Sequence, residues 1–146
     1  MTSAAPIVRV ATVAELDART LHDLLRLRVD VFVVEQACPY PELDGRDVEP
    51  TTRHWWIDDA GAPVAVLRTL VEPDGSSRLG RVVTRRDRRG EGLAARLVAT
   101  ALADVPRPVR IDAQSHLADW YARFGFVADG DEFVEDGIPH LPMRLG

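Results

Sequence analysis

The sequence predicts an α+β (mixed α/β) domain built on a mixed β-sheet. Three strand-like runs, at residues 54–57, 63–71 and 78–84, are separated by linkers that contain Ala-Gly and Asp-Gly, which favour tight turns. These runs therefore predict an antiparallel meander. The third run is followed by a helical stripe and by another strand that ends at residue 113, an order that predicts a right-handed crossover with parallel pairing. We expect one domain over residues 1–146.

The first third of the chain is expected to contain a strand, a helix and a long loop. Residues 7–13 are β-branched and alternate weakly, as in a strand. From residue 14 to about residue 35 the apolar side chains fall mostly on one helical face. The end of this segment, VDVFVVEQ, has strong strand propensity and leaves the end of the helix open. Residues 37–53 are rich in proline and acidic side chains, which predicts a long connection of the kind that is often functional.

The last third is expected to contain two helices, a strand and a hairpin. Residues 93–105 carry an apolar helical stripe, and residues 109–113 are typical of a short buried strand. A second helix is predicted at 116–124, where a glycine follows as a C-cap signal. Residues 126–134 and 141–145 are expected to form a final hairpin. The last strand is expected at an edge of the sheet, where a second copy of the chain could pair with it as a homodimer.

Two local patterns predict where individual side chains lie. Trp55 and Trp56 are neighbours in a predicted strand, so one is expected in the core and the other at the surface or in a cleft. In the long loop, Asp44, Asp47 and Glu49 are expected to be solvated charges. The alternative for these carboxylates is that they attract a cationic amine.

Charge and composition exclude several classes of function. Eighteen basic and twenty-three acidic residues give a net charge of −5, which argues against nucleic acid as a partner. All the basic residues are arginine, so neither a lysine Schiff base nor a lysine-based phosphate loop is available. No apolar run approaches the roughly 20 residues of a membrane span, and residues 1–10 lack the features of a secretory signal. The single cysteine, Cys38, excludes an internal disulfide and is in keeping with a cytoplasmic location.

The strongest local motif is Arg89-Gly90-Glu91-Gly92-Leu93-Ala94, which joins a predicted strand to a predicted helix. Unpaired amide groups and the helix dipole make such a helix start suitable for an anion, and glycine lets a phosphate approach the backbone. Residues 85–91 hold four arginines and two acids, a local charge of +2. Two alternatives stay open. One is a solvated arginine-rich loop before a helix; the other is a dinucleotide-binding fingerprint completed by Asp112, 20 residues beyond Gly92.

The same motif resembles the R/Q-x-x-G-x-G/A pyrophosphate loop of the GNAT N-acetyltransferase superfamily. Further along, Trp120-Tyr121-Ala122-Arg123-Phe124-Gly125-Phe126 resembles the F-Y-x-x-x-G-F segment of that superfamily. The order of the predicted elements also fits. Four other segments resemble its ElaA-like branch, namely VFVVEQACPYPELDGRD, RH at 53–54, AQSHL at 113–117 and EDGIPH at 135–140. These segments span most of residues 20–143.

The resemblance implies a GNAT-like fold, with a central mixed sheet of six to seven strands, flanking helices, and a parallel pair that splays apart to bind acetyl-CoA. The pantetheine arm would pair like an added strand with the backbone of residues 81–83. The pyrophosphate would lie on the amides of residues 89–94, with the arginines at 85, 86 and 88 near the remaining phosphates. The implied cofactor-binding residues are Arg81, Val82, Val83, Arg88, Arg89, Gly90, Glu91, Gly92, Leu93 and Ala94.

The resemblance also implies that Tyr121 protonates the departing sulfur of CoA. A phenol suits this role because it keeps its proton at neutral pH; the alternative is a core aromatic residue. Glu35, His54, His116 and His140 lie in the matching segments and are candidates for the general base. His116 stands five residues before Tyr121 and is the first choice, with Glu35 as the leading carboxylate. We expect no metal site, because the histidines and carboxylates lack ligand spacing.

These observations together predict an acyltransferase. It would transfer an acetyl group from acetyl-CoA directly to an amine, on a small molecule or a peptide, with neither nucleic acid nor a membrane as a partner. A module that binds acyl-CoA without catalysis is the alternative from another class. A dinucleotide-binding domain is the third interpretation, and it depends on the glycine motif and Asp112.

Overall fold

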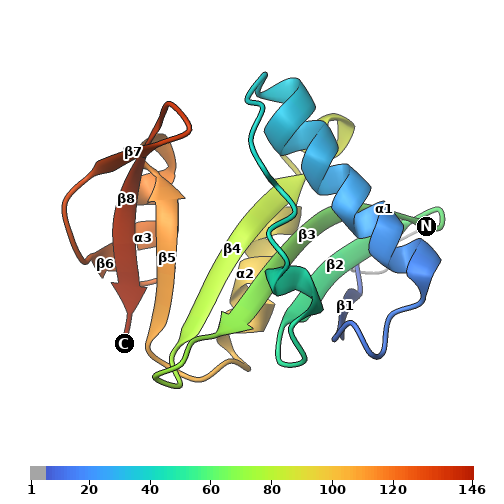
Figure 1. Ribbon diagram of the computed structural model, residues 1–146, viewed down its shortest axis with the longest axis horizontal. Coiled ribbons are helices and arrows are strands. Elements are labelled where there is room, and N and C mark those ends of the chain that lie inside the picture. Colours follow the sequence, from blue (N-terminus) through green and yellow to red (C-terminus); the bar gives the residue numbers. More distant parts are fainter. Residues whose placement is uncertain (1–5) are drawn as a thin grey trace.

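The computed structural model describes residues 6–146, in which eight strands form one mixed sheet flanked by three α-helices (Figure 1). The strands are β1 (Val8–Ala11), β2 (Arg53–Asp59), β3 (Ala62–Val71), β4 (Ser77–Thr84), β5 (Val109–Gln114), β6 (Val127–Ala128), β7 (Phe133–Glu135) and β8 (Ile138–Leu145). The helices are α1 (Ala18–Val29), α2 (Leu93–Leu102) and α3 (Ala118–Ala122). The order across the sheet is β1-β2-β3-β4-β5-β8-β6, with β7 also paired to β8. The predicted fold class is confirmed, with eight strands in place of six to seven.

Strands β1 to β4 form the predicted antiparallel meander, and different helices cover its two faces. Helix α1 lies on one face and α2 on the other (Figure 1). Trp55 and Trp56 point to opposite faces of β2, and both are buried: Trp55 packs in the core beneath α2 and Trp56 in the core beneath α1. The prediction that one of them lines the surface or a cleft is wrong, because both faces are covered.

Helix α1 begins later than predicted and does not give way to a strand. Asp17 is its N-cap and accepts a hydrogen bond from the amide of Thr20 at 2.7 Å. At its other end the chain continues as a π-helical segment, Asp30–Glu35. Val31 of that segment belongs to the same apolar cluster as Leu24. Packing on the sheet therefore overrides the strand propensity of these residues.

Strands β4 and β5 form the predicted parallel pair, connected through helix α2. Their register contains only Ser77 opposite Val109 and Arg78 opposite Arg110. Beyond these two pairs the strands diverge, as Figure 1 shows. The predicted splay is confirmed, and it leaves the facing backbone edges of both strands without a strand partner.

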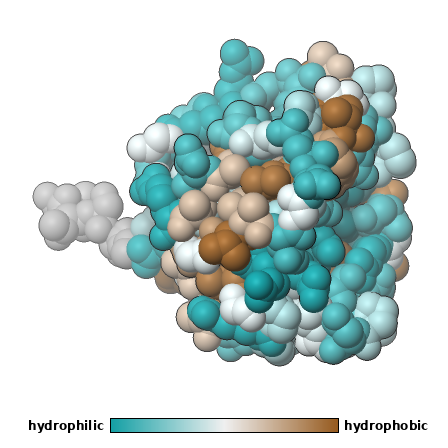
Figure 2. Space-filling model, turned by 90° about the vertical axis from the view of Figure 1, so that its left-hand side faces the viewer, coloured by the Kyte–Doolittle hydropathy of each residue, from teal (hydrophilic) through white to brown (hydrophobic). Residues whose placement is uncertain are grey.

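The C-terminal hairpin joins β7 to β8 through the turn Asp136-Gly137. Strand β8 lies between β5 on one side and β6 and β7 on the other. The prediction that residues 141–145 form an edge strand open to a second copy is therefore wrong, since β6 and β7 form this edge. Figure 2 views the molecule from this side and shows apolar areas, near the centre and toward the upper right, within a largely hydrophilic surface. Val127 and Val134 of these two strands are exposed.

Candidate active site

A cavity of about 940 Å³ opens where β4 and β5 diverge. Its walls come from β4, β5, the start of α2, helix α3, the connection after α1 and the tip of the C-terminal hairpin. This volume is within the usual range for a site that holds a small molecule. Within residues 6–146, no three His, Cys, Asp or Glu side chains are placed to hold a metal ion, and no helix is long and apolar enough to cross a membrane.

The β4 wall contains the three residues predicted to contact pantetheine. Arg81, Val82 and Val83 all line the cavity. At this point β4 pairs with β3 on one side only, so its other edge presents free amide and carbonyl groups to the cavity. An extended polar chain can hydrogen-bond to such an edge as an added strand would.

The start of α2 forms the end of the cavity that suits an anion. Gly90 and Gly92 have left-handed φ values of 84° and 77°, and neither has a neighbouring atom within 4 Å of the place a Cβ would occupy. Among residues 6–146, no side chain caps the start of α2. The amide of Arg96 bonds back to the carbonyl of Gly92 at 3.1 Å. The preceding amides of the first turn are therefore available to a phosphate.

Arg85, Arg88 and Arg89 of this loop already have carboxylate partners. Arg88 bonds to Glu91 at 2.8 Å and to Asp59, whereas Arg89 makes two bonds to Glu35, at 2.6 and 2.8 Å. The side chain of Glu91 binds Arg88 and is not among the groups that line the cavity; the predicted contact of this residue with the cofactor is through its backbone amide. A phosphate that recruits these guanidinium groups must exchange places with the carboxylates.

Tyr121 is both a core residue and a cavity residue. Its ring packs edge-on against Trp120 and Phe126, with centroids 4.9 and 6.0 Å apart, and the residue is 7% exposed. It also lines the cavity. Burial raises the pKa of Tyr121 to about 12. The phenol therefore keeps its proton at neutral pH and can donate it or a hydrogen bond into the cavity.

The four candidate bases lie in three different environments. His116 is exposed and lines the cavity, in the helical turn that leads into α3. His140 also lines it, with its Nδ1 2.7 Å from the carbonyl oxygen of Ile138. His54 is buried away from the cavity, with its Nε2 3.0 Å from the carbonyl oxygen of Asp47. Glu35 is not part of the lining, and its bonds to Arg89 lower the pKa of the carboxyl.

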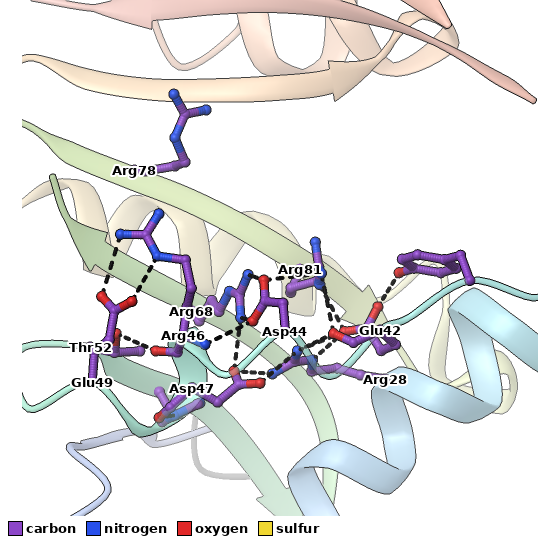
Figure 3. A network of polar contacts seen from close by, with 12 residues as sticks. Arg28, Glu42, Asp44, Arg46, Asp47, Glu49, Thr52, Arg68, Arg78 and Arg81 are labelled. Atoms are coloured by element: carbon purple, nitrogen blue, oxygen red, sulfur yellow. Dashed lines mark hydrogen bonds and ion pairs between the residues drawn. The ribbon is translucent and has the colours of Figure 1, made fainter. Parts of the chain in front are cut away.

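A buried ion network lies beside the cavity, and the sequence analysis did not foresee it (Figure 3). Arg28 of α1 bonds to Glu42 and Asp47, each at 2.6 Å, and Arg68 of β3 bonds to Asp44 at 2.6 Å and Asp47 at 3.1 Å. The prediction that Asp44, Asp47 and Glu49 are solvated loop charges is therefore wrong for Asp47, which is buried. Asp44 and Glu49 keep access to solvent but are paired with Arg68 and Arg46. The signal in the sequence was Arg28, a charged residue on the apolar face of a predicted helix. A buried arginine requires a carboxylate partner.

The fold agrees with what comparison with known proteins shows. The family described as an acetyltransferase (GNAT) domain matches residues 20–146. This chain belongs to the GNAT acetyltransferase family. The dinucleotide-binding interpretation is therefore wrong: in this GNAT sheet the glycine motif follows β4, the last strand of an antiparallel meander, and Asp112 forms an ion pair with Arg78 at 3.1 Å.

Close relatives of this GNAT chain are known in several bacteria. The UPF0039 protein Rv2851c of Mycobacterium tuberculosis is 56% identical over 134 residues, which are 88% of this chain and 86% of the relative. The crystal structure of an acyl-CoA N-acyltransferase from Pseudomonas aeruginosa has a TM-score of 0.90 and 40% identity, covering 97% of this chain and 100% of its own. The crystal structure of ElaA from Escherichia coli has a TM-score of 0.89 and 34% identity, covering 96% and 99%. The resemblance to the ElaA-like branch is confirmed.

Proposed function

We propose that this GNAT acyltransferase moves an acetyl group from acetyl-CoA directly to an amine, on a small molecule or a peptide. The observation that carries the proposal is the continuity of one cavity, from the glycine loop at the start of α2, along the free edge of β4, to Tyr121. Acetyl-CoA is a long molecule with an anionic end and a thioester end. The description of the Pseudomonas aeruginosa relative as an acyl-CoA N-acyltransferase supports a CoA thioester as the donor.

In the proposed complex the parts of acetyl-CoA meet different residues. The pyrophosphate lies on the amides of residues 89–94, where Gly90 and Gly92 leave room for it. The pantetheine arm lies along residues 81–83, and the thioester reaches Tyr121. Loop arginines such as Arg88 add charge near the phosphates once they leave their carboxylate partners.

The proposed reaction is a single displacement at the thioester carbonyl. The neutral amine nitrogen attacks the carbonyl carbon, the C–N bond forms and the C–S bond breaks. The proton lost by the nitrogen goes to a base, for which His116 is our first choice because it lines the cavity close to α3. Tyr121 gives its proton to the departing sulfur, so that CoA leaves as a thiol. Glu35 is the second candidate base, although its bonds to Arg89 weaken it as a proton acceptor.

A titration followed by a turnover assay tests the proposal. Calorimetric titration with acetyl-CoA is expected to show saturable binding, whereas NADH at the same salt concentration is expected not to bind. A panel of amines is then screened for release of the CoA thiol. Failure of acetyl-CoA to bind would overturn the proposed function. Binding without turnover on any amine would leave a non-catalytic acyl-CoA-binding module. We also propose a cytoplasmic location, in keeping with a sequence whose single cysteine, Cys38, cannot form an internal disulfide.

A further inference from the structure

Strand β4 is interrupted at Arg81 by a β-bulge. Val66 of β3 pairs with Val83, and the next pair joins Arg68 to Gly80, so one residue of β3 faces two residues of β4. Arg81 has a φ of 54°, a left-handed conformation that is unfavourable for a residue with a Cβ, whereas the neighbouring Gly80 does not adopt it. Strain of this kind persists only where the surroundings hold it in place.

The side chain of Arg81 supplies the contacts that hold this bulge. Its Nε donates to Oε2 of Glu42 at 2.8 Å, and its Nη2 donates to the carbonyl oxygen of Glu42 at 3.2 Å (Figure 3). The same Nη2 lies 3.5 Å from the carboxylate of Asp44. The guanidinium also lies over the ring of Tyr40, 5.9 Å from its centroid. Glu42 is buried and is also bonded to Arg28 of α1 at 2.6 Å, so the contact of Arg81 with Glu42 connects the bulge to the loop and to helix α1.

Arg81 thereby connects two walls of the cavity. Its own backbone and that of Val82 belong to the free edge of β4, where the proposed function places the pantetheine arm. Tyr40 and Asp44 line the cavity from the connection between α1 and β2, which faces β4 across the ion pairs. A displacement of the bulge would therefore be transmitted to this second wall through the guanidinium.

We propose that Arg81 is a positioning residue that couples the acyl-CoA groove to the wall formed by residues 40–47. This inference rests on the proposed function. A pantetheine arm that pairs with β4 adds hydrogen bonds to the bulge and reduces its motion. Because Arg81 is bonded through two nitrogens to Glu42, the same binding event orders residues 40–47 as well. Residues 40–47 are then ordered beside the thioester before the acceptor amine binds.

Four variants separate this coupling from a merely structural role. Arg81→Gly and Arg81→Asn both tolerate a left-handed φ, so they keep the bulge while removing the ion pairs. Arg81→Lys keeps the positive charge but cannot donate from two nitrogens to Glu42 at once, as the guanidinium does. Arg78→Ala is the matched control, because Arg78 lies on the same strand and pairs with Asp112 at 3.1 Å. Its longer pair with Glu72, at 3.9 Å, can be lost while Glu72 keeps its bond to Arg46 at 2.9 Å.

Amide hydrogen exchange, measured with and without saturating acetyl-CoA, reads the coupling directly. In the wild-type chain we expect slower exchange at residues 89–95, at 79–84 and also at 40–47, the last by about fivefold or more, a usual size for coupled sites. In Arg81→Gly and Arg81→Asn, acetyl-CoA should still slow exchange at residues 89–95 and 79–84 but no longer at 40–47. Arg81→Lys should show part of the slowing at 40–47, and Arg78→Ala should match the wild type.

The outcomes are distinct for the inference and for the proposed function. Protection of residues 40–47 that persists in both Arg81→Gly and Arg81→Asn would overturn the inference. So would protection of 79–84 and 89–95 without any effect at 40–47 in the wild type. If acetyl-CoA slowed exchange nowhere in the chain, the proposed function would fail, and the inference would fail with it.

Discussion

Arg28 of α1 and Asp47 of the loop before β2 form an ion pair of 2.6 Å with both side chains removed from solvent. Arg68 of β3 reaches the same carboxylate at 3.1 Å. Burial alone would raise the pKa of Asp47, but the bonds from Arg28 and Arg68 outweigh it and leave this pKa below its usual value. One carboxylate thus joins a helix, a loop and the sheet beside the cavity.

Asp47→Asn should destabilise the protein strongly. The substitution leaves two buried guanidinium groups short of one negative charge, and removal of one member of a buried pair typically costs about 3–5 kcal/mol. Urea unfolding, followed by the fluorescence of the buried Trp55 and Trp56, measures the loss. Asp129→Asn is the control, since Asp129 is partly exposed and its ion pairs with Arg110 and Arg144 are 3.7 and 3.6 Å long. That change should cost less than about 1 kcal/mol, and equal losses in both variants would contradict the prediction.

Stability should also fall as the pH drops below neutrality, because of His54. Burial lowers the pKa of His54 from its ordinary value of 6.5, against the opposing effect of Asp47. Below pH 6.5 the His54 imidazole therefore binds a proton in the unfolded chain, whereas in the folded chain it stays neutral to a lower pH. The free energy of unfolding then falls by at most about 1.4 kcal/mol per pH unit. His54→Gln should reduce this slope, whereas His22→Gln, at an exposed position, should leave it unchanged. Unfolding curves between pH 5 and pH 7 measure this dependence of stability on pH. An unchanged slope in His54→Gln would show that His54 is not its cause.

Local patterns predicted most of the elements, because alternation, helical spacing and turn glycines act over a few residues. The meander, the crossover and the glycine loop before α2 followed from such patterns. The position of β8 inside the sheet did not, because a strand's neighbours depend on contacts from distant parts of the chain. Trp56 was misplaced for a related reason: the covering of its face by α1 is a tertiary contact.

The cofactor loop of the site was predicted, but the ion-pair partners of Arg81 and Arg89 were not, because those partners are also distant in sequence. The residues of the cofactor loop are contiguous, so the motif from Arg89 to Ala94 could be recognised from its glycines. The partners of the arginines lie far away in sequence: Glu35 is 54 residues from Arg89, and Glu42 is 39 residues from Arg81. No local pattern identifies such pairs. The only indication of a buried ion pair in the sequence was Arg28, an arginine on the apolar face of a predicted helix.

Tyr121→Phe should lower turnover by about a hundredfold, the lower end of what a general acid contributes. Phenylalanine preserves the ring that packs against Trp120 and Phe126, so the fold and the groove are kept, and only the hydroxyl is lost. The Kd for acetyl-CoA is therefore expected to stay within about twofold. Thiol release on an amine found in the screen gives the turnover, and calorimetry gives the Kd. If turnover is unchanged, the proton donor is another group.

His116→Gln and Glu35→Gln distinguish the two candidate bases. We expect His116→Gln to lower kcat/KM by about a hundredfold, the lower end of what a general base contributes, because the group that accepts the proton is lost. Glu35→Gln should lower kcat/KM much less, since this side chain bonds Arg89 and does not line the cavity. Thiol release on an amine found in the screen gives kcat/KM for both variants. A large loss in Glu35→Gln alone would make the carboxylate the base.

Gly92→Ala should weaken acetyl-CoA binding without an unusual loss of stability. Gly92 has a φ of 77° at the start of α2, so an alanine there adds strain of about 1–2 kcal/mol and places a methyl group where the pyrophosphate is proposed to lie. Gly61→Ala is a close match, because Gly61 has a φ of 79° in the turn between β2 and β3, and a Cβ at either glycine would meet no atom within 4 Å. The two variants should lose similar stability in thermal unfolding, yet only Gly92→Ala should raise the Kd for acetyl-CoA, by about tenfold or more. An equal Kd in both variants would mean that the glycine loop does not hold the phosphates.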